Sequence, residues 1–149
     1  MSVYLGVDPG ASGALALVDV DGRYVEHMKL AETEHDVAGW LRGWAWAVRF
    51  ACLERVSAMP RQGVASSFKF GSSFGFCRGL LVAYDIPHEL VSPAVWQGGM
   101  KCRSGGDKNK TKAAAQALWS GQVKVTHAIA DALLLAEYCR RTRGAGPAT

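Results

Sequence analysis

Short apolar runs bounded by turn residues dominate the first half of the chain. They have the length of β-strands, and an Asp21-Gly22 dipeptide typical of a β-hairpin turn separates the second run from the third. Another apolar run ends at Glu54, and a shorter one follows later. The pattern predicts five strands, over residues 3–8, 13–20, 23–30, 49–54 and 88–91.

Apolar residues recur at helical spacing between and after these strands. Thr33 is suited to cap the first helix, in which Trp40, Trp44 and Trp46 supply apolar bulk that we assign to the core. A loop rich in glycine and lysine, residues 98–107, precedes the third predicted helix. Four helices are expected, over about residues 33–48, 66–84, 110–119 and 126–141.

The length and composition of the chain fit one α/β domain. A chain of 149 residues with 49% hydrophobic residues can bury one core and is too short for two. We expect a single domain over residues 1–143 and a flexible tail over residues 144–149.

The cysteines and the N-terminal sequence indicate the cellular setting. Each of the 4 cysteines stands alone, without the spacing of a zinc knuckle or a disulfide framework, which favours a reducing cytoplasm. The chain has no basic-then-apolar leader and no apolar stretch near the roughly 20 residues that span a bilayer. We therefore expect a cytoplasmic protein without membrane contact. The net charge of +4 favours a polyanionic partner only weakly.

Two predicted strands end in a carboxylate, at Asp8 and Glu54. The carboxyl ends of neighbouring strands form a crevice at the edge of a sheet, where such groups can meet. Asp131 adds a third carboxylate on an otherwise apolar helix, and His127 lies one turn before it on the same face. A carboxylate in apolar surroundings needs a partner, and a shared divalent cation is one. Alternatively, Asp8 caps the following turn and His127 caps its helix.

Basic residues gather in the loop after residue 98 and at the start of the next helix. A flexible basic segment at a helix N-terminus is suited to phosphate contacts, although a solvated loop would have the same composition. These residues are Lys101, Arg103, Lys108, Lys110 and Lys112.

The helix predicted over residues 66–84 carries a small residue at every fourth position. Glycine costs about 1 kcal/mol relative to alanine inside a helix, so the stripe must allow something to approach closely. The sheet beneath the helix, a second copy of the helix and a DNA backbone are the three alternatives. The stripe consists of Ser67, Gly71, Gly75, Gly79 and Ala83.

Three motifs resemble those of the RuvC family of Holliday-junction resolvases and occur in the same order. They are Val-Asp-Pro-Gly at residues 7–10, Leu-Glu-Arg-Val at 53–56 and His-x-x-Ala-Asp-Ala-Leu at 127–133. The stretch over residues 59–71 is similar to the RuvC-like nucleases encoded by bacteriophages and prophages. The resemblance covers residues 3–141. It implies a ribonuclease-H-like fold of the RuvC/integrase superfamily, with a five-stranded mixed sheet flanked by helices.

The resemblance also implies an activity and its partners. Members of this family act as homodimers that nick two strands of a four-way DNA junction symmetrically, by metal-dependent phosphodiester hydrolysis. We therefore expect a structure-selective endodeoxyribonuclease that resolves branched DNA in the cytoplasm of a bacterial host cell. Two Mg2+ ions per active site are implied, with Mn2+ able to replace them and no organic cofactor.

By motif position, the resemblance assigns chemical roles to individual residues. Asp8, Glu54 and Asp131 become metal ligands in the catalytic site. His127 becomes the fourth, although many relatives carry a carboxylate in its place. A lysine should meet the charge that develops on the phosphate, and Lys110 is assigned this role. Two neighbours, Lys108 and Lys112, are the alternatives.

The resemblance further indicates which residues contact DNA. Ser57 stands where several cellular resolvases carry an aromatic residue that stacks on junction bases, so Met59, Phe68 or Phe70 would take that role. The expected DNA-contacting residues are Lys69, Arg78, Lys101, Arg103, Lys108, Lys110, Lys112, Phe68 and Phe70.

Two other functions compete with the nuclease. One is a catalytically weak protein that binds DNA junctions, whose metal site is used for positioning or is poorly occupied because His127 replaces an acid. The Asp-Pro-Gly-x-Ser-Gly turn at residues 8–13 also resembles the phosphate turn of actin-like and sugar-kinase ATPases. A chain of 149 residues leaves no room for the second domain that those folds need.

Overall fold

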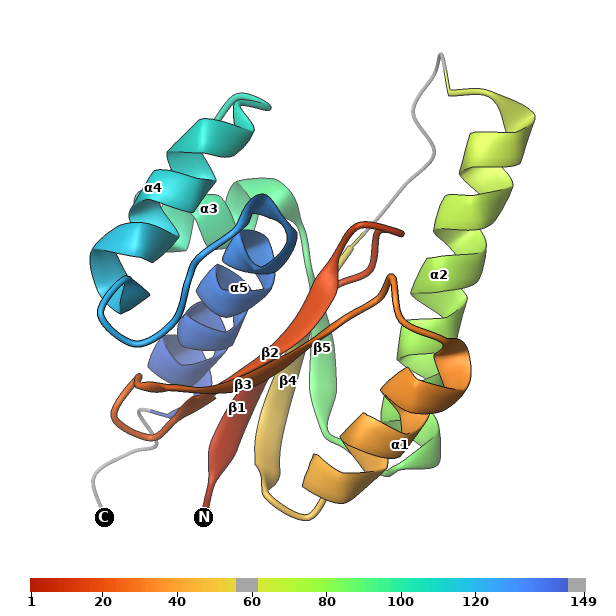
Figure 1. The fold of residues 1–149 in the computed structure, drawn as a ribbon, viewed down its shortest axis with the longest axis horizontal. Helices are drawn as coiled ribbons and strands as arrows, with labels where there is room; N and C mark the ends of the chain where they lie inside the picture. Colours follow the sequence, from red (N-terminus) through yellow and green to blue (C-terminus); the bar gives the residue numbers. More distant parts are fainter. Residues whose placement is uncertain (56–61, 145–149) are drawn as a thin grey trace.

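A central β-sheet with helices on both faces organises the chain (Figure 1). The computed structural model describes residues 1–55 and 62–144, so Ser57, Met59 and the predicted tail after Gly144 lie outside the described residues. The strands are β1 (Val3–Asp8), β2 (Ala14–Asp19), β3 (Tyr24–Lys29), β4 (Val48–Glu54) and β5 (His88–Val91). The helices are α1 (Glu34–Trp44), α2 (Val64–Ala83), α3 (Pro93–Gly99), α4 (Lys108–Trp119) and α5 (His127–Arg143).

The sheet is mixed and has the strand order β3-β2-β1-β4-β5. β1, β2 and β3 form an antiparallel meander, whereas β4 pairs in parallel with β1 and β5 in parallel with β4. Gly22 adopts a φ of 83° in the turn between β2 and β3, which glycine can do without strain. The prediction of a five-stranded mixed sheet is therefore confirmed.

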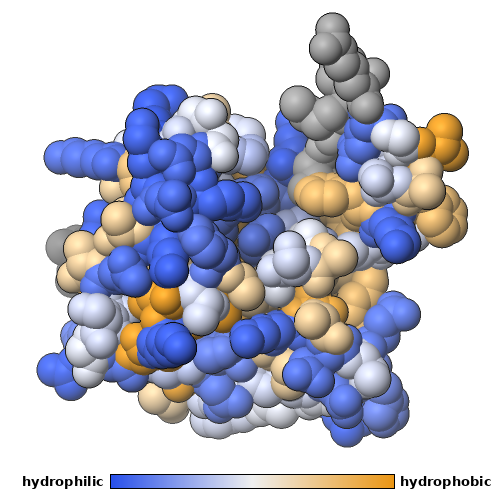
Figure 2. All heavy atoms as spheres, turned by 45° about the horizontal axis from the view of Figure 1, so that its top comes forward, coloured by the Kyte–Doolittle hydropathy of each residue, from blue (hydrophilic) through white to orange (hydrophobic). Residues whose placement is uncertain are grey.

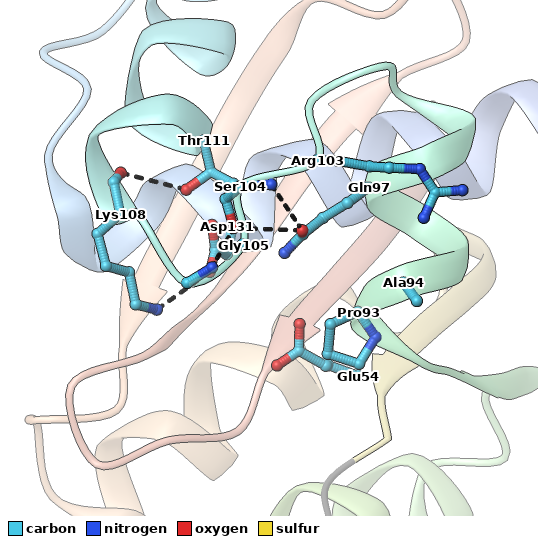
Figure 3. A pocket seen from close by; sticks show the side chains of 11 residues that line it. Glu54, Pro93, Ala94, Gln97, Arg103, Ser104, Gly105, Lys108, Thr111 and Asp131 are labelled. Carbon is cyan, nitrogen blue, oxygen red and sulfur yellow. Dashed lines mark hydrogen bonds and ion pairs between the residues drawn. The ribbon is translucent and has the colours of Figure 1, made fainter.

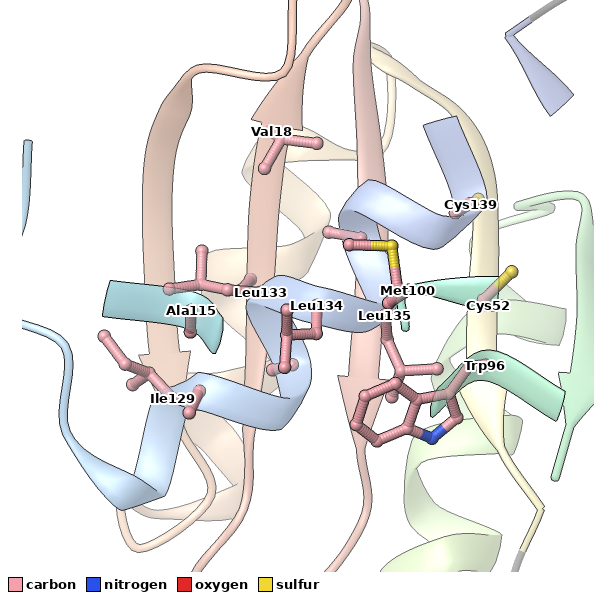
Figure 4. Close-up of a cluster of buried hydrophobic side chains, with 14 of the residues drawn as sticks. Val18, Cys52, Trp96, Met100, Ala115, Ile129, Leu133, Leu134, Leu135 and Cys139 are labelled. Carbon is pink, nitrogen blue, oxygen red and sulfur yellow. The ribbon is translucent and has the colours of Figure 1, made fainter. Parts of the chain in front are cut away.

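The two faces of the sheet form two hydrophobic cores. Side chains alternate along a strand, so Val3, Leu5 and Val7 of β1 join the core under α1 and α2, while Tyr4 joins the other. That second core is built mainly from α5, with contributions from α3 and α4. Figure 4 shows its α5 residues Ile129, Leu133, Leu134, Leu135 and Cys139 together with Trp96 and Met100 from the α3 region.

Helix α5 lies directly on β1. Gly6 makes this close approach possible, because a Cβ at this position would overlap the carbonyl oxygen of Ala132 and the backbone nitrogen of Ala136. Every residue of α5 from Ile129 to Glu137 is buried. The contact fixes where α5 lies along β1, and so it fixes the position of Asp131, in the second turn of α5, relative to the end of that strand.

Some predicted helix boundaries differ from the structure. α1 ends at Trp44, so Trp46 lies in the turn before β4 and is 73% exposed. The assignment of Trp46 to the core is therefore wrong, whereas Trp40 and Trp44 pack partly against the core under α1 and α2. α2 begins at Val64 and α4 at Lys108, each two residues earlier than expected.

The sequence pattern did not predict α3, although its start carries recognisable signals. Ser92 Oγ accepts a hydrogen bond from the Val95 backbone nitrogen at 3.4 Å, and Pro93 occupies the first turn. The helix has only 7 residues and ends in two glycines, so it shows no helical periodicity to detect.

The glycine stripe of α2 faces open space. A Cβ at Gly71, Gly75 or Gly79 would have no heavy atom within 4 Å among the described residues outside the helix's own backbone. The buried side of the helix is formed instead by Cys77 and Leu81. Packing against the sheet, one of the three alternatives, is therefore excluded for these glycines.

The structure shows the state of the cysteines and whether any described helix could span a membrane. All four cysteines are buried and unpaired by disulfides. Across residues 1–55 and 62–144, no helix combines the length and the apolar character needed to cross a membrane.

Candidate active site

Three carboxylates from three different elements gather at one edge of the sheet. Asp8 ends β1 and Glu54 ends β4. These strands are parallel neighbours in which Val7 pairs with Leu53, so the two acids leave the sheet at the same edge. Asp131 approaches from α5 and is close enough for its charge to act on both acids. The structure thus brings together the three acids that the sequence pattern singled out.

The acids repel one another in partly buried surroundings. Burial and then the charge of Asp131 raise the pKa of Asp8 to about 6, while Lys108 and the Gly10 backbone N–H oppose the rise. Burial and then the charge of Asp8 raise the pKa of Glu54 to about 7, and a hydrogen bond from Trp96 opposes this rise. A bound cation would relieve the repulsion.

Glu54 and Asp131 each have one oxygen engaged by a neighbouring side chain. The indole Nε1 of Trp96, a fully buried residue, donates to Glu54 Oε2 at 2.7 Å. Lys108 Nζ donates to Asp131 Oδ2 at 3.3 Å. The other oxygen, Asp131 Oδ1, is buried and has no hydrogen-bond partner among the described residues. A buried carboxylate oxygen without a partner is unfavourable, and a bound ion is one explanation for it.

The donor chemistry of the three acids fits a hard divalent cation. Mg2+ and Mn2+ prefer carboxylate oxygens, and Asp131 Oδ1 is available as a ligand because no described residue donates a hydrogen bond to it. As the side chains stand, no three Asp, Glu, His or Cys residues within 1–55 and 62–144 form a group that could hold one ion. Lys108 neutralises Asp131 in this arrangement, so it must move aside before Asp131 can bind a cation through Oδ2.

Two residues with predicted catalytic roles are exposed. His127 is the first residue of α5, is exposed, and belongs to no potential metal-binding group in the described chain. Lys110 is exposed, and the lysine that contacts an acid is Lys108. Partial burial lowers the pKa of Lys108, but the charges of Asp131 and Asp8 outweigh this and raise it. The roles assigned to His127 and Lys110 stay predictions.

A cavity of about 540 Å3 opens beside Glu54 and Asp131 (Figure 3). Its walls come from α3, from the segment between α3 and α4, and from the first turn of α4. Besides the two acids, its lining includes Pro93, Gln97, Arg103, Ser104, Lys108 and Thr111. Trp96, Gln97 and Ser104 were missed by sequence reasoning, and the Ser-Pro signal for a helix start at residues 92–93 could have drawn attention to the first two.

The first half of α2 carries other residues predicted to contact DNA. Phe70 lies against the turn after β1, where its Cε2 would be 3.7 Å from a Cβ at Gly10. Phe68 is 75% exposed and lines, with Lys69, a second groove of about 410 Å3. Arg78 lies on the same helix with its guanidinium carbon 5.6 Å from the ring centre of Phe74. In Figure 2, hydrophilic side chains dominate the side of this face that carries α4, and apolar ones are prominent at the outer end of α2.

Comparison with known proteins defines the fold. No protein-family model and no curated protein matches the chain. A structure of Thermus thermophilus RuvC is similar, with a TM-score of 0.66 and 16% identity, over 95% of this chain and 96% of that chain. T. thermophilus RuvC in complex with a Holliday junction substrate is similar with a TM-score of 0.64 and 16% identity, over 97% of this chain and 96% of that chain. The chain therefore has the ribonuclease-H-like fold of RuvC, and the predicted fold class is confirmed.

Removing one charge from the acids should stabilise the fold at high pH. Because the pKa values of Asp8 and Glu54 are raised, the folded state binds more protons than the unfolded state between about pH 4 and pH 7, and stability falls as the pH rises through this window. Without divalent cations, we expect Asp8→Asn to raise the free energy of unfolding by roughly 1–3 kcal/mol at pH 8 and to change it little at pH 4. Urea unfolding at the two pH values measures the difference.

Asp19→Asn is the matched control for this measurement. Asp19 ends β2 opposite Val3, at the other edge of the sheet, and its Oδ1 accepts hydrogen bonds from the Asp21 and Arg23 backbone nitrogens that an asparagine oxygen can also accept. Asp19→Asn should therefore not reproduce the stabilisation at pH 8 that we expect for Asp8→Asn. An equal effect of Asp8→Asn at both pH values would contradict the repulsion between the acids.

Proposed function

We propose that this protein is a metal-dependent endonuclease that cuts branched DNA, and four-way junctions in particular. The observation that carries the proposal is the gathering of three carboxylates, one with an unpartnered buried oxygen, at the strand edge of a RuvC-like fold. One of the similar solved structures is a RuvC in complex with a Holliday junction substrate, which supports a four-way junction as the DNA substrate.

The three acids are the proposed metal ligands. Asp8, Glu54 and Asp131 would hold Mg2+ or Mn2+, two ions in all, with His127 as the proposed fourth ligand. Bound divalent ions supply Lewis acidity that activates the attacking water and stabilises the leaving 3'-oxygen. The Trp96 indole orients Glu54 through its 2.7 Å hydrogen bond, which leaves Oε1 of that acid for other partners.

Lys108 is a stronger candidate than Lys110 for the lysine that meets charge on the phosphate. It lies beside Asp131 at the cavity wall, whereas Lys110 is not among the residues that line this cavity. Once a cation binds Asp131, the Lys108 ammonium becomes available to a phosphate oxygen that stands close to the acids. The same residue would therefore neutralise the free site and stabilise the occupied one.

DNA would contact two groups of residues on either side of the acids. Phe68, Lys69, Phe70 and Arg78 belong to α2, and the exposure of Phe68 leaves its ring accessible to a junction base. Cationic side chains on the other side can contact phosphates without reading sequence. The second group comprises Lys101, Arg103, Lys108, Lys110 and Lys112.

Residues 59–71 resemble the RuvC-like nucleases of bacteriophages and prophages. This resemblance supports a narrower proposal, that the protein is a nuclease encoded by a phage or prophage. Such a protein would act in the cytoplasm of a bacterial host cell. Residues 59–61 lie outside the described residues, and Gln62 and Gly63 precede the start of α2.

A second candidate function is junction binding with little catalysis. Two observations favour it: His127 is exposed, and no three potential ligands in the described chain stand ready to hold one ion. In that case the acids would position a cation for DNA binding, and the protein would bind four-way junctions without cutting them.

Incubation with an end-labelled four-way junction and a matched linear duplex, in EDTA, Mg2+ or Mn2+, tests the nuclease proposal. We expect paired, symmetric nicks that are confined to the junction and require metal. Asp8→Asn should slow cleavage by more than roughly 100-fold and retain junction binding, because it removes a ligand charge from the metal site. Denaturing gels report the nicks, and fluorescence anisotropy reports binding.

Three variants serve as controls for the cleavage assay. Asp19→Asn should cut like the wild type, because it makes the same chemical change at the opposite edge of the sheet. Lys108→Met should slow cleavage more than Lys110→Met does. Tight junction binding by the wild type without any nicks would favour the second candidate function, junction binding. An equal loss of cleavage in Asp8→Asn and Asp19→Asn would contradict the assigned metal site.

We also propose that two copies of the chain associate through α2, which gives the symmetric arrangement that paired nicking needs. The helix exposes Val64 at 89% and Val82 at 65%, and its glycine stripe has nothing packed on it within the described residues. Small residues allow two helices to approach closely. A second copy is therefore one of the two remaining alternatives for the stripe.

Gly75→Leu tests this association. A Cβ at Gly75 would have no described heavy atom within 4 Å outside the helix's own backbone, so the fold should persist while the interface is blocked. We expect light scattering to show a dimer for the wild type and a monomer for Gly75→Leu. Gly39→Leu is the matched control, since Gly39 is also exposed in the middle of a helix with nothing within 4 Å of an added Cβ. A dimeric Gly75→Leu variant would rule out this face.

A further inference from the structure

The side chain of Gln97 extends from α3 into the cavity beside the acids (Figure 3). Its Oε1 accepts two hydrogen bonds from Ser104, one from the backbone nitrogen at 3.2 Å and one from Oγ at 3.3 Å. Ser104 is only 8% exposed, and its Oγ also accepts a hydrogen bond from the Gly106 backbone nitrogen at 3.2 Å. The segment before α4 therefore holds the Gln97 amide in one place.

The orientation of this amide follows from the chemistry of its partner. A backbone N–H can only donate, so the oxygen of the Gln97 amide, and not its nitrogen, must face Ser104. The amide nitrogen Nε2 is then directed away from Ser104, on the side of the cavity. Within residues 1–55 and 62–144 it has no hydrogen-bond acceptor. Gln97 consequently offers two donors to the cavity and no acceptor.

A group that can only donate suits a phosphate oxygen better than a base edge. Glutamine reads adenine with its donor and its acceptor together, and here Ser104 already occupies the acceptor. Phosphate oxygens only accept hydrogen bonds. Lys108 and Arg103 line the same cavity and offset part of the negative charge of Glu54 and Asp131. The guanidinium of Arg103 lies against Gly98, where an added Cβ would be 2.6 Å from its Nη2.

We propose that Gln97 is a DNA-contacting residue that donates a hydrogen bond from Nε2 to a non-bridging oxygen of the phosphate next to the one that is cut. Ser104 is the positioning residue that fixes the amide for this contact. The inference rests on the proposed nuclease function. It also gives α3 a double role, because Trp96 of the same helix holds Glu54. One short helix would thus set the position of the DNA backbone relative to a metal-binding acid.

Gln97→Glu is the most direct test, because a carboxylate keeps an acceptor for Ser104 while it replaces the donors with a negative charge. We expect its affinity for a four-way junction in EDTA, measured by fluorescence anisotropy, to fall by about tenfold or more. Gln97→Met, which removes the donors without adding charge, should give a smaller loss in the same direction. Gln122→Glu is the matched control: Gln122 is exposed, its Oε1 accepts a hydrogen bond from the Tyr24 backbone nitrogen that a carboxylate can also accept, and the change should alter the affinity by less than about twofold.

Neutral phosphate analogues locate the contact. A methylphosphonate removes the charge and one acceptor oxygen at a single phosphate of the junction. At the contacted phosphate, we expect the analogue to weaken junction binding by the wild type. It should also abolish most of the difference in junction affinity between the wild type and Gln97→Met. At other phosphates that difference should persist. Thermal unfolding of each variant checks that the fold is intact.

Each other outcome overturns a defined part of the account. Gln97 variants that bind and cut like Gln122→Glu would overturn the inference alone. A loss of affinity that is the same for every methylphosphonate, or that follows a change of base sequence, would also overturn the phosphate contact. A wild-type protein that neither binds nor cuts any four-way junction would overturn the proposed function itself.

Discussion

The close contact between α5 and β1 is the constraint on which the site depends. At Gly6 the backbone of α5 touches the strand so closely that even a methyl group would overlap it. The helix cannot slide or rise without losing this contact, and its residues from Ile129 to Glu137 are buried. Asp131 is therefore carried to the edge where β1 and β4 end, although it is far from Asp8 and Glu54 in sequence.

This arrangement brings together three acids, one buried and two partly buried, that repel one another. Ordinary cores avoid such a set, since a buried carboxylate is unfavourable unless it is paired. Here Trp96 and Lys108 each engage one oxygen, which limits the repulsion without removing it. The raised pKa values of Asp8 and Glu54 and the unpartnered Asp131 Oδ1 all express the same excess of negative charge. Strain of this kind is a feature of functional sites, where a ligand relieves it.

Much of the fold and part of the site could be predicted from the sequence. The strands were predictable because their apolar runs end at clear turn signals, and Asp8 and Glu54 stood out because each follows such a run. Trp46 was misplaced because apolar character alone does not show where α1 ends. The lysine beside the acids could not be chosen from Lys108, Lys110 and Lys112, since the choice depends on where α4 begins.

The contributions of α3 were harder to foresee. The Trp96 and Gln97 contacts join this helix to Glu54 and Ser104, and both depend on tertiary packing that no local pattern reveals. The exposure of the α2 glycines likewise follows from which face of the helix meets the sheet. That choice is made by Cys77 and Leu81 on the buried side, and not by the glycines themselves.

The central claim is that Asp8, Glu54 and Asp131 form a site for divalent cations. Crystals grown with Mn2+ and measured at wavelengths on either side of the manganese absorption edge would test it most directly. The account predicts an anomalous peak within coordination distance of all three carboxylates, with Lys108 Nζ moved away from Asp131 Oδ2. A map without a peak among these acids, with the Lys108–Asp131 ion pair intact at saturating Mn2+, would contradict it.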